Sequence, residues 1–393
     1  MNVLRPLSVG LLVAAAMALS ACGEQPGPVT GGTPMRDQAE ATFVGSDECA
    51  ACHDRIYSGW LTTQHSVVMQ EVEASPRAIK GDFVSPSAIR TFDLEADIII
   101  THGIQWKQRY IDSEWRVLPA QWNFDSQTWS PYQADTWMER DWRPLCAYCH
   151  VVGFDTETLE WSELSVGCEA CHGPGSAHVD EPRIGNIINP ARLTPTLAGD
   201  ICTNCHTRGK SPDGEWDFPI GYNVGDALGP QHFTPVPKDN ESAWWPDGAT
   251  KMHRQQGIEW KESKHFIAGV NCVTCHTVHS SSTAISLRET LPNNLCVSCH
   301  SEISTDPVTG HAPIAGAPQH SNCVACHMPP TGTSADFGDE RSHRMWVIKP
   351  QVTIDLGGGD PEAQPNSCSF CHPDIDPAVL QEALDGGLAA LKQ

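Results

Sequence analysis

The sequence repeats one short motif eight times: two cysteines separated by two residues and followed at once by a histidine. This spacing is that of a c-type haem attachment site, in which both thiols bond to the porphyrin and the histidine becomes an axial ligand of the iron. The predicted attachment residues are Cys49, Cys52, Cys146, Cys149, Cys168, Cys171, Cys202, Cys205, Cys272, Cys275, Cys296, Cys299, Cys323, Cys326, Cys368 and Cys371. The predicted proximal ligands are His53, His150, His172, His206, His276, His300, His327 and His372. The motif therefore predicts eight covalently attached haems.

Zinc and disulfides are the two alternatives to haem. The pair Cys146/Cys149 is followed after eighteen residues by Cys168/Cys171, a spacing that also fits a four-cysteine zinc ribbon. Disulfides would suit an exported chain. Neither alternative explains why a histidine follows every pair, when histidine makes up only 18 of 393 residues. The motifs use 16 of the 17 cysteines and leave only Cys22.

The N-terminal residues predict a secreted lipoprotein. Residues 1–21 read as a signal peptide, because Arg5 precedes an apolar run at 7–19 that is too short to span a bilayer comfortably. The run ends in Leu-Ser-Ala-Cys, which resembles the bacterial lipoprotein cleavage box, so we expect Cys22 to carry the lipid anchor. A plain signal peptide with a chance cysteine is the alternative. Gly23, by the same resemblance, favours the outer membrane, with the protein facing the periplasm or the cell surface.

The low number of residues per motif predicts an unusual core. The mature chain has only about 46 residues for each motif, so the porphyrins must replace much of the apolar core. We predict a multihaem cytochrome c fold that is mostly α, with short helices and long loops round eight haems and a small β-rich, tryptophan-containing insert. The predicted segments after the signal are a flexible linker at 22–42, an octahaem domain at 43–375 with motif-dense clusters at 146–206 and 265–327, and a C-terminal helix at 376–393.

The β-rich insert falls in the longest interval without a motif. The alternation of residues 98–111 and 115–118 predicts strands. The tryptophans of this interval are expected to pack on porphyrin edges. The alternative is a substrate pocket beside an open haem, formed by His102, Arg109 or Tyr110.

Ten histidines lie outside the motifs, enough to give every haem a second axial histidine. The candidate distal ligands are His65, His102, His178, His265, His279, His311, His320 and His343. His232 and His253 are ligands or surface residues. Methionine is an alternative distal ligand that raises the potential, but the methionines form no repeat. On a helix His279 would share a side with His276, so we expect His279 to bind a second iron.

Bis-histidine ligation limits what the haems can do. Such an iron has no open position and passes only electrons, so an electron carrier or conduit is the favoured function, and no catalytic residue is predicted. The alternatives are a multihaem reductase of a small nitrogen or sulfur compound at one five-coordinate haem, and a subunit of a polymeric haem wire. The formal charge of −23 disfavours nucleic acid and favours basic redox partners. We expect these partners to be other cytochromes or a membrane quinol-oxidising complex.

Several blocks resemble a multihaem cytochrome c family with doubled CxxCH motifs, related to the cytochrome c-554 that accepts electrons from hydroxylamine oxidoreductase. The most specific blocks are CEACHGPGSAH at 168–178 and CHMP at 326–329. Further matching blocks lie at 44–53, 269–279 and 365–372. The resemblance implies a multihaem fold with haem c. It leaves the activity open, because the family contains both electron carriers and enzymes.

Overall fold

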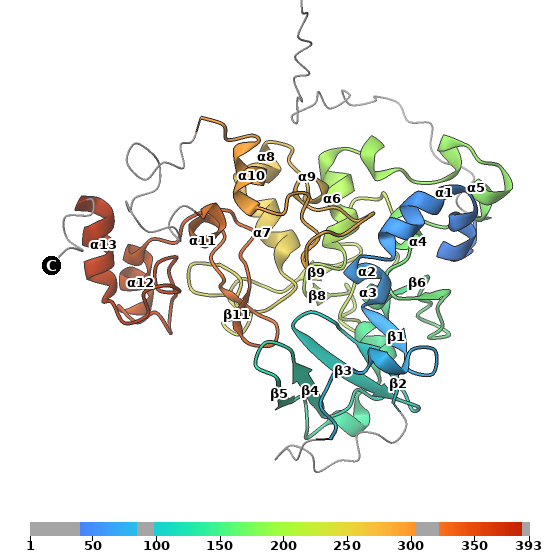
Figure 1. Cartoon of the computed structure of the whole chain (residues 1–393), viewed down its shortest axis with the longest axis horizontal. Coiled ribbons are helices and arrows are strands. Elements are labelled where there is room, and N and C mark those ends of the chain that lie inside the picture. The colour runs from blue at the N-terminus through green and yellow to red at the C-terminus, as the bar shows by residue number, and fades with distance from the viewer. Residues whose placement is uncertain (1–39, 85–97, 303–321, 387–393) are drawn as a thin grey trace, which may run out of the picture.

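The computed structural model describes residues 40–84, 98–302 and 322–386 (Figure 1). The predicted signal peptide at 1–21, the lipidation site Cys22, most of the 22–42 linker and the last residues of the predicted C-terminal helix lie outside these ranges, as do His311 and His320. Within the described ranges, none of the helices has both the length and the apolar character needed to cross a membrane.

Short helices connected by long loops form most of the body (Figure 1). The helices are α1 (Ser46–Trp60), α2 (Gln64–Val67), α3 (Tyr148–His150), α4 (Glu169–His172), α5 (Ser176–Asp180), α6 (Pro195–Thr203), α7 (Gln256–Glu262), α8 (Lys264–Ile267), α9 (Cys272–Cys275), α10 (Pro292–Val297), α11 (Cys323–His327), α12 (Pro350–Gly357) and α13 (Pro377–Gly386). Several are single turns made of the CxxCH motif itself. Proline in the first turn starts α6, α10 and α12, because its missing N–H would be unpaired there in any residue.

The first motif lies inside a helix. The helix α1 begins at Ser46 and continues past His53 to Trp60. The helix is kinked at His53, whose φ of −115° and ψ of 34° are not helical. The motif therefore bends α1 in the middle, and the histidine side chain leaves the helix at the bend.

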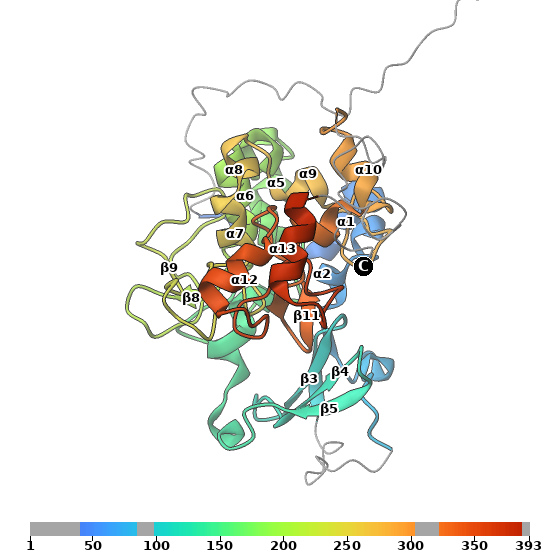
Figure 2. The same cartoon turned by 90° about the vertical axis from the view of Figure 1, so that its left-hand side faces the viewer.

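A five-stranded antiparallel sheet lies along one edge of the helical body in both views (Figures 1 and 2). Its strands, in spatial order, are β1 (Met69–Glu71), β2 (Ile98–His102), β3 (Lys107–Asp112), β4 (Ala120–Asn123) and β5 (Thr128–Pro131). The alternating run 98–111 is thus two strands joined by a hairpin rather than one. Gly103 makes this turn possible, because its φ is +100° and a Cβ there would lie 2.3 Å from the Lys107 carbonyl oxygen.

The sheet builds an ordinary apolar core, which the sparse sequence had not led us to expect. Tyr110 packs with Phe83, Trp122 and Trp129 on one face of the sheet. On the other face, a second cluster that includes Trp142 joins the sheet to the segment of the second motif. These tryptophans pack in protein cores, because a sheet offers two faces on which side chains can pack. Their packing on porphyrin edges stays a prediction.

The remaining strands form three small hairpins. They are β6 (Val151–Val152) with β7 (Glu163–Leu164), β8 (Gly209–Lys210) with β9 (Thr234–Pro235), and β10 (Gly332–Thr333) with β11 (Phe337–Glu340). At the C-terminal end of the body α13 packs beside α12 (Figure 1). Asp376 caps α13 by accepting a hydrogen bond from the Ala378 backbone N–H at 2.7 Å.

Candidate haem-binding sites

Motif cysteines and histidines line one continuous cavity of about 3560 Å³. Every motif after the first contributes at least one residue to its wall. A site for a single small molecule measures about 300–1,000 Å³, so this cavity has room for several large groups. Leu380 and Leu384 of α13 lie on the same wall as Cys368 and Cys371, which places the C-terminal helix over the last motif.

The thiols are arranged neither as zinc sites nor as disulfides. All sixteen motif cysteines are free thiols. In residues 40–84, 98–302 and 322–386, no three side chains among histidine, cysteine, aspartate and glutamate are grouped so as to hold a metal ion. The zinc-ribbon alternative for Cys146 to Cys171 and the disulfide alternative therefore have no counterpart in the structure.

Six of the eight candidate distal histidines lie within the described residues, and each of these six lies opposite a motif histidine. The ring centroids are 6.4 Å apart for His53–His178, His65–His206 and His276–His343, 6.1 Å for His172–His279 and 5.9 Å for His265–His300. A histidine nitrogen binds a metal at about 2.0–2.1 Å, so two opposed rings with a metal between them have centroids about 6 Å apart. These five pairs thus have the separation that an intervening iron requires.

The histidine hydrogen bonds leave the correct nitrogen free for iron. The Nδ1 atoms of His172 and His276 face the carbonyl oxygens of Ile188 at 2.8 Å and Ile285 at 3.0 Å. A carbonyl only accepts, so Nδ1 carries the proton and Nε2 keeps its lone pair. Among the distal candidates, the Nδ1 atoms of His178 and His343 likewise face backbone carbonyl oxygens, at 3.1 and 3.0 Å. Ligating histidines are commonly held in this way.

Burial keeps these imidazoles neutral, as a metal ligand must be. Burial, followed by the charge of Arg254, lowers the pKa of His150 to about 3. Burial and the nearby His65 lower the pKa of His206 to about 3 as well. Burial and His276 lower the pKa of His343 to about 4. At neutral pH each ring therefore has one nitrogen lone pair to offer.

His279 reaches a different motif from the one beside it in sequence, but not for the reason we expected. The segment from His276 to His279 is not helical, because α9 ends at Cys275 and His276 is extended, with φ −103° and ψ 154°. Because the chain is extended here, His276 and His279 face different partners. His276 faces His343, and His279 faces His172. Gly59 of α1 allows this close approach, since a Cβ there would lie 2.3 Å from the His279 carbonyl oxygen.

Thiols of different motifs touch and so order the motifs in space. The thiols that hydrogen-bond are those of Cys49 with Cys168, Cys149 with Cys205, Cys202 with Cys272, and Cys296 with Cys323. Cys171 and Cys202, Cys275 and Cys299, and Cys326 and Cys371 lie near enough to influence one another electrostatically. Numbering the motifs along the chain, the contacts run 1–3–4–5–6–7–8, and motif 2 joins at motif 4 as a side branch.

A buried glutamate that we did not predict fixes the first motif beside the third. Glu169, in the spacer between Cys168 and Cys171, accepts hydrogen bonds from the backbone N–H groups of Val44, Gly45 and Gly175 at 2.7–3.1 Å. An acidic residue within a motif spacer was the available sequence signal for this role.

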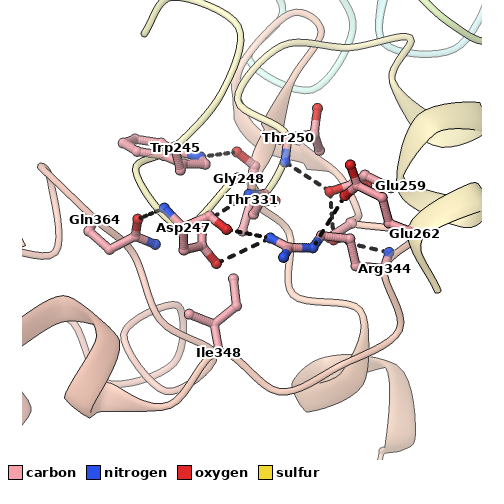
Figure 3. Close-up of polar contacts among 12 residues, drawn as sticks. Trp245, Asp247, Gly248, Thr250, Glu259, Glu262, Thr331, Arg344, Ile348 and Gln364 are labelled. Carbon is pink, nitrogen blue, oxygen red and sulfur yellow. Dashed lines mark hydrogen bonds and ion pairs between the residues drawn. The ribbon is translucent and has the colours of Figure 1, made fainter. Parts of the chain in front are cut away.

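A second buried glutamate holds the segment of His343. Glu259 is fully buried and accepts hydrogen bonds from the backbone N–H groups of His343 at 2.6 Å and Thr250 at 2.8 Å, and from the Ser342 hydroxyl at 2.8 Å. Figure 3 shows Arg344 between Asp247 and the two glutamates of α7. The partners are far apart in sequence, so no local pattern could have predicted this network.

Comparison with known proteins agrees with this geometry. The family "Doubled CXXCH motif" matches residues 265–305, and the family "Cytochrome c554 and c-prime" matches residues 105–173. The multiheme cytochrome MtrA of Shewanella baltica (strain OS185) is 31% identical over 155 residues, which are 37% of this chain and 46% of MtrA. The chain therefore spans less than half the length of this curated relative. The crystal structure of the outer cell wall cytochrome OcwA shares the fold, with a TM-score of 0.70 and 23% identity over 88% of this chain and 86% of OcwA.

The chain is a multihaem c-type cytochrome. The histidine spacings, the neutral rings and the cavity fit haem c, which supplies an iron that changes between the ferric and ferrous states.

The second motif of the cytochrome departs from the other sites. His102 lies opposite His150, but the ring centroids are only 4.1 Å apart and the two Nε2 atoms 3.2 Å apart. Two metal–nitrogen bonds need about 4 Å between the nitrogens, so these rings must separate before any iron can lie between them. The first cysteine of the motif lies in a π-helical turn, Arg143–Ala147. Such turns are rare in proteins, and many of those that occur lie at functional sites.

Basic side chains surround this second motif, although burial lowers the pKa of Lys107 to about 7. His102 on β2 pairs across the sheet with Arg109 on β3, so both side chains stand on the same face, and Lys107 follows the same alternation. His102, Lys107, Arg109, Arg208, His253 and Arg254 all line the cavity. Tyr110 points the other way, into the sheet core, where its hydroxyl accepts a hydrogen bond from the Gly81 N–H. Tyr110 is therefore not part of the pocket that we considered.

Of the two histidines left unassigned by the sequence, His253 lies in the cavity wall among these basic side chains. The Nδ1 atom of His232 faces the Ile220 carbonyl oxygen at 2.9 Å, and its ring packs against Tyr222. His232 does not line the cavity.

Proposed function

We propose that the cytochrome transfers electrons along closely packed, mainly bis-histidine haems. The observation that carries the proposal is the set of five imidazole pairs separated by 5.9–6.4 Å, each joining a motif histidine to a histidine from elsewhere in the chain. An iron held between two histidines offers no position to a substrate, so its function is to accept and pass on an electron.

We propose the following attachment and ligands. The eight cysteine pairs, from Cys49/Cys52 to Cys368/Cys371, hold haem c, and the histidine after each pair is the proximal ligand. The described distal ligands are His178 for the His53 haem, His279 for His172, His65 for His206, His343 for His276 and His265 for His300. His311 and His320 lie outside the described residues and are proposed for the later motifs.

The order of neighbouring thiols supports a route for electrons along the chain of motifs. The order 1–3–4–5–6–7–8 leads from α1 at one end of the body to α12 and α13 at the other (Figure 1). In this proposal electrons enter near one end and leave near the other. Motif 2 then receives electrons from motif 4 without lying on the main route.

We also propose an exported protein anchored by a lipid on Cys22, at the outer membrane. Its partners are other cytochromes with basic surfaces, and a membrane quinol-oxidising complex remains a prediction. The acidic charge of −23 supports basic partners. Replacing Cys22 with serine should move the protein from the membrane fraction to the soluble fraction. Retention of the variant in membranes after a salt wash would exclude the lipid anchor.

Haem counting tests the main proposal. A pyridine haemochrome assay combined with intact mass should give eight haems per chain. Electron paramagnetic resonance of the oxidised protein should then be dominated by low-spin ferric signals. A count of two or fewer haems would end the proposal. Negative-stain imaging of the pure protein separates a single carrier from a subunit of a filament.

A second candidate, reduction of a small nitrogen or sulfur compound, is favoured by one observation alone. The pair His102–His150 lacks the spacing of the other pairs and lies among basic side chains, which include Arg109 and Arg254.

A further inference from the structure

Two arginines in the cavity wall have more hydrogen-bond donors than partners. Arg208 and Arg254 both line the cavity. Within residues 40–84, 98–302 and 322–386, the Arg208 side chain forms no hydrogen bond or salt bridge, and its Nη1 atom is buried without a partner. The Arg254 guanidinium makes one contact, from Nη2 to the Asp217 carbonyl oxygen at 3.5 Å, and its Nε is buried and unpaired. Buried N–H groups are nearly always paired, so these side chains indicate an acceptor that the described polypeptide does not supply.

The two guanidiniums also lack a counter-charge. The Arg208 backbone N–H donates to Gln255 Oε1 at 3.4 Å, which joins the two segments, and Arg254 lies close enough to Arg208 to repel its charge. The Asp217 carboxylate, which also acts on Arg208, forms its salt bridge with Lys210 at 3.1 Å. Two like charges held together away from water are unfavourable unless an anion lies beside them. The pair therefore has the charge, as well as the free donors, to hold a carboxylate.

This arginine pair lies where the second and fourth motifs meet. The thiols of Cys149 and Cys205 hydrogen-bond to each other, and the charge of Arg254 acts on both. The same charge acts on the rings of His150 and His206. The side branch leaves the main order of motifs at this contact. A carboxylate held by the two arginines would thus belong to the branch point.

The backbone of Arg254 has a conformation that glycine would adopt at less cost. Its φ is +65°, in the left-handed region. The Glu340 carboxylate accepts a hydrogen bond from the Arg254 backbone N–H, and the Gly257 N–H donates to the His206 carbonyl oxygen at 2.9 Å. A residue with a Cβ persists in this region only where its surroundings hold it there, and such residues cluster at functional sites and ligand clamps. An arginine at this position indicates a role for its side chain.

We propose that Arg208 and Arg254 form a clamp for a haem propionate where the second and fourth motifs meet. Propionates are the carboxylates of haem, and the planar guanidinium presents paired N–H donors that match a carboxylate. Positive charge beside a haem favours the ferrous state, so the clamp raises the reduction potential of the haem that it holds. The proposal rests on the proposed haem attachment. It deepens the proposed electron route by naming the residues that set the potential at the branch point.

Arg254→Gln tests the clamp in the purified holoprotein. The equilibrium constant for reducing one haem should fall about tenfold, as Coulomb's law gives for one charge about 10 Å away at an effective dielectric constant of about 20. This fall is about 59 mV for a one-electron couple. Spectroelectrochemical titration measures the potentials. Resonance Raman spectroscopy measures the propionate bending bands, which should shift in the variant because they report the hydrogen bonds to the carboxylate.

Three further variants separate pairing from a general loss of charge. Arg254→Lys keeps the charge but not the planar fork, so most of the potential should return while the Raman shift remains. Arg208→Gln should lower the potential of the same haem and gives an independent test of the clamp. Arg192→Gln is the matched control, because Arg192 is exposed and carries the same charge. It should leave both readouts unchanged. Haem content and mass show whether each variant has matured.

Two arms identify the source of the carboxylate. In a chain with Cys146 and Cys149 changed to serine, the effect of Arg254→Gln should persist if the propionate belongs to the fourth-motif haem and disappear if it belongs to the second-motif haem. Phosphate added to the wild type should change neither the potentials nor the Raman bands, because the clamp is already filled. A response to phosphate would show that the arginines bind a free anion and would overturn the proposal.

The outcomes also separate the clamp from the function of the whole protein. Eight haems, with potentials and Raman bands that Arg254→Gln and Arg208→Gln leave unchanged, would overturn the clamp and leave the electron conduit standing. Two haems or fewer in the wild type would overturn the conduit itself.

Discussion

The pairs His276–His343 and His102–His150 each join a motif histidine to a distant histidine, but the two pairs differ in ring separation and in hydrogen bonding. In both, a motif histidine faces a histidine from a distant segment. The first pair is separated by 6.4 Å and its two Nδ1 atoms face backbone carbonyls. The second is separated by 4.1 Å, and the Nδ1 atom of its distal member accepts from an indole.

The difference teaches that the role of a distal histidine depends on what its other nitrogen contacts. When Nδ1 donates to a carbonyl, Nε2 keeps its lone pair and can bind a metal. When Nδ1 accepts from an indole N–H, the proton of the neutral ring is on Nε2, which is then a hydrogen-bond donor. The supports differ as well. The backbone of His343 is held by Glu259, and His102 is the last residue of β2, which lies between β1 and β3 in the sheet. Each prediction below breaks or sharpens this contrast.

Removing one attachment site has the largest expected effect. Changing Cys146 and Cys149 to serine should reduce the count to seven haems. It should also abolish the binding of azide, a small anion that reports the open iron of the second candidate function. The matched change of Cys272 and Cys275 should also remove one haem but keep azide binding, since that haem is closed by His343. Intact mass and azide titration measure both. Azide binding that survives loss of Cys146 and Cys149 would place the open iron elsewhere.

Replacing His343 with alanine should open the other pair. The His276 haem would lose its sixth ligand, so a second high-spin iron should appear and azide should bind in two phases. The reduction potential of that haem should rise, because a neutral donor to the ferric iron is lost. His102→Ala is the control and should give a single phase. A spectrum of His343→Ala that equals the wild type would show that His343 is not a ligand.

Glu259 should contribute to stability on the His276 side alone. Glu259→Ala leaves three buried donors without their acceptor and should lower the free energy of unfolding by about 3–5 kcal/mol. The low-spin signal of the His276 haem should broaden, while azide binding at the second motif stays unchanged. Glu382→Gln on exposed α13 is the control and should change stability little. Denaturant unfolding and paramagnetic resonance check these results.

Glu340 should give the cationic side a pH dependence. Burial, then repulsion from Asp339, raises the pKa of Glu340 to about 7 from an ordinary value of 4.5. Between these pH values the unfolded chain has lost the proton and the folded chain retains it, so stability should fall as pH rises through this window. The loss is at most about 3 kcal/mol, and Glu340→Gln should remove it. A variant as pH-sensitive as the wild type in urea unfolding at pH 5 and pH 7.5 would contradict this.

Local features of the fold were accessible to sequence reasoning, and long-range ones were not. The alternation at 98–111 indicated β-structure, and Asp376-Pro377 indicated the start of α13. The hairpin at Gly103 was missed because alternation does not register a turn inside a run. The apolar core was missed because residue counts do not show that a sheet gathers the tryptophans of this interval on its two faces.

The sequence by itself determined the predicted attachment sites for haem and the predicted proximal histidine of each, because the CxxCH pattern is complete within five residues. It also supplied the candidate distal histidines. Only the tertiary structure decided which motif each of them faces, because these partners lie on segments far apart along the chain. The tertiary structure likewise decided that His102 carries its proton on Nε2, since Trp142, forty residues away, donates a hydrogen bond to its Nδ1. A hydrogen bond of that kind has no local sequence pattern.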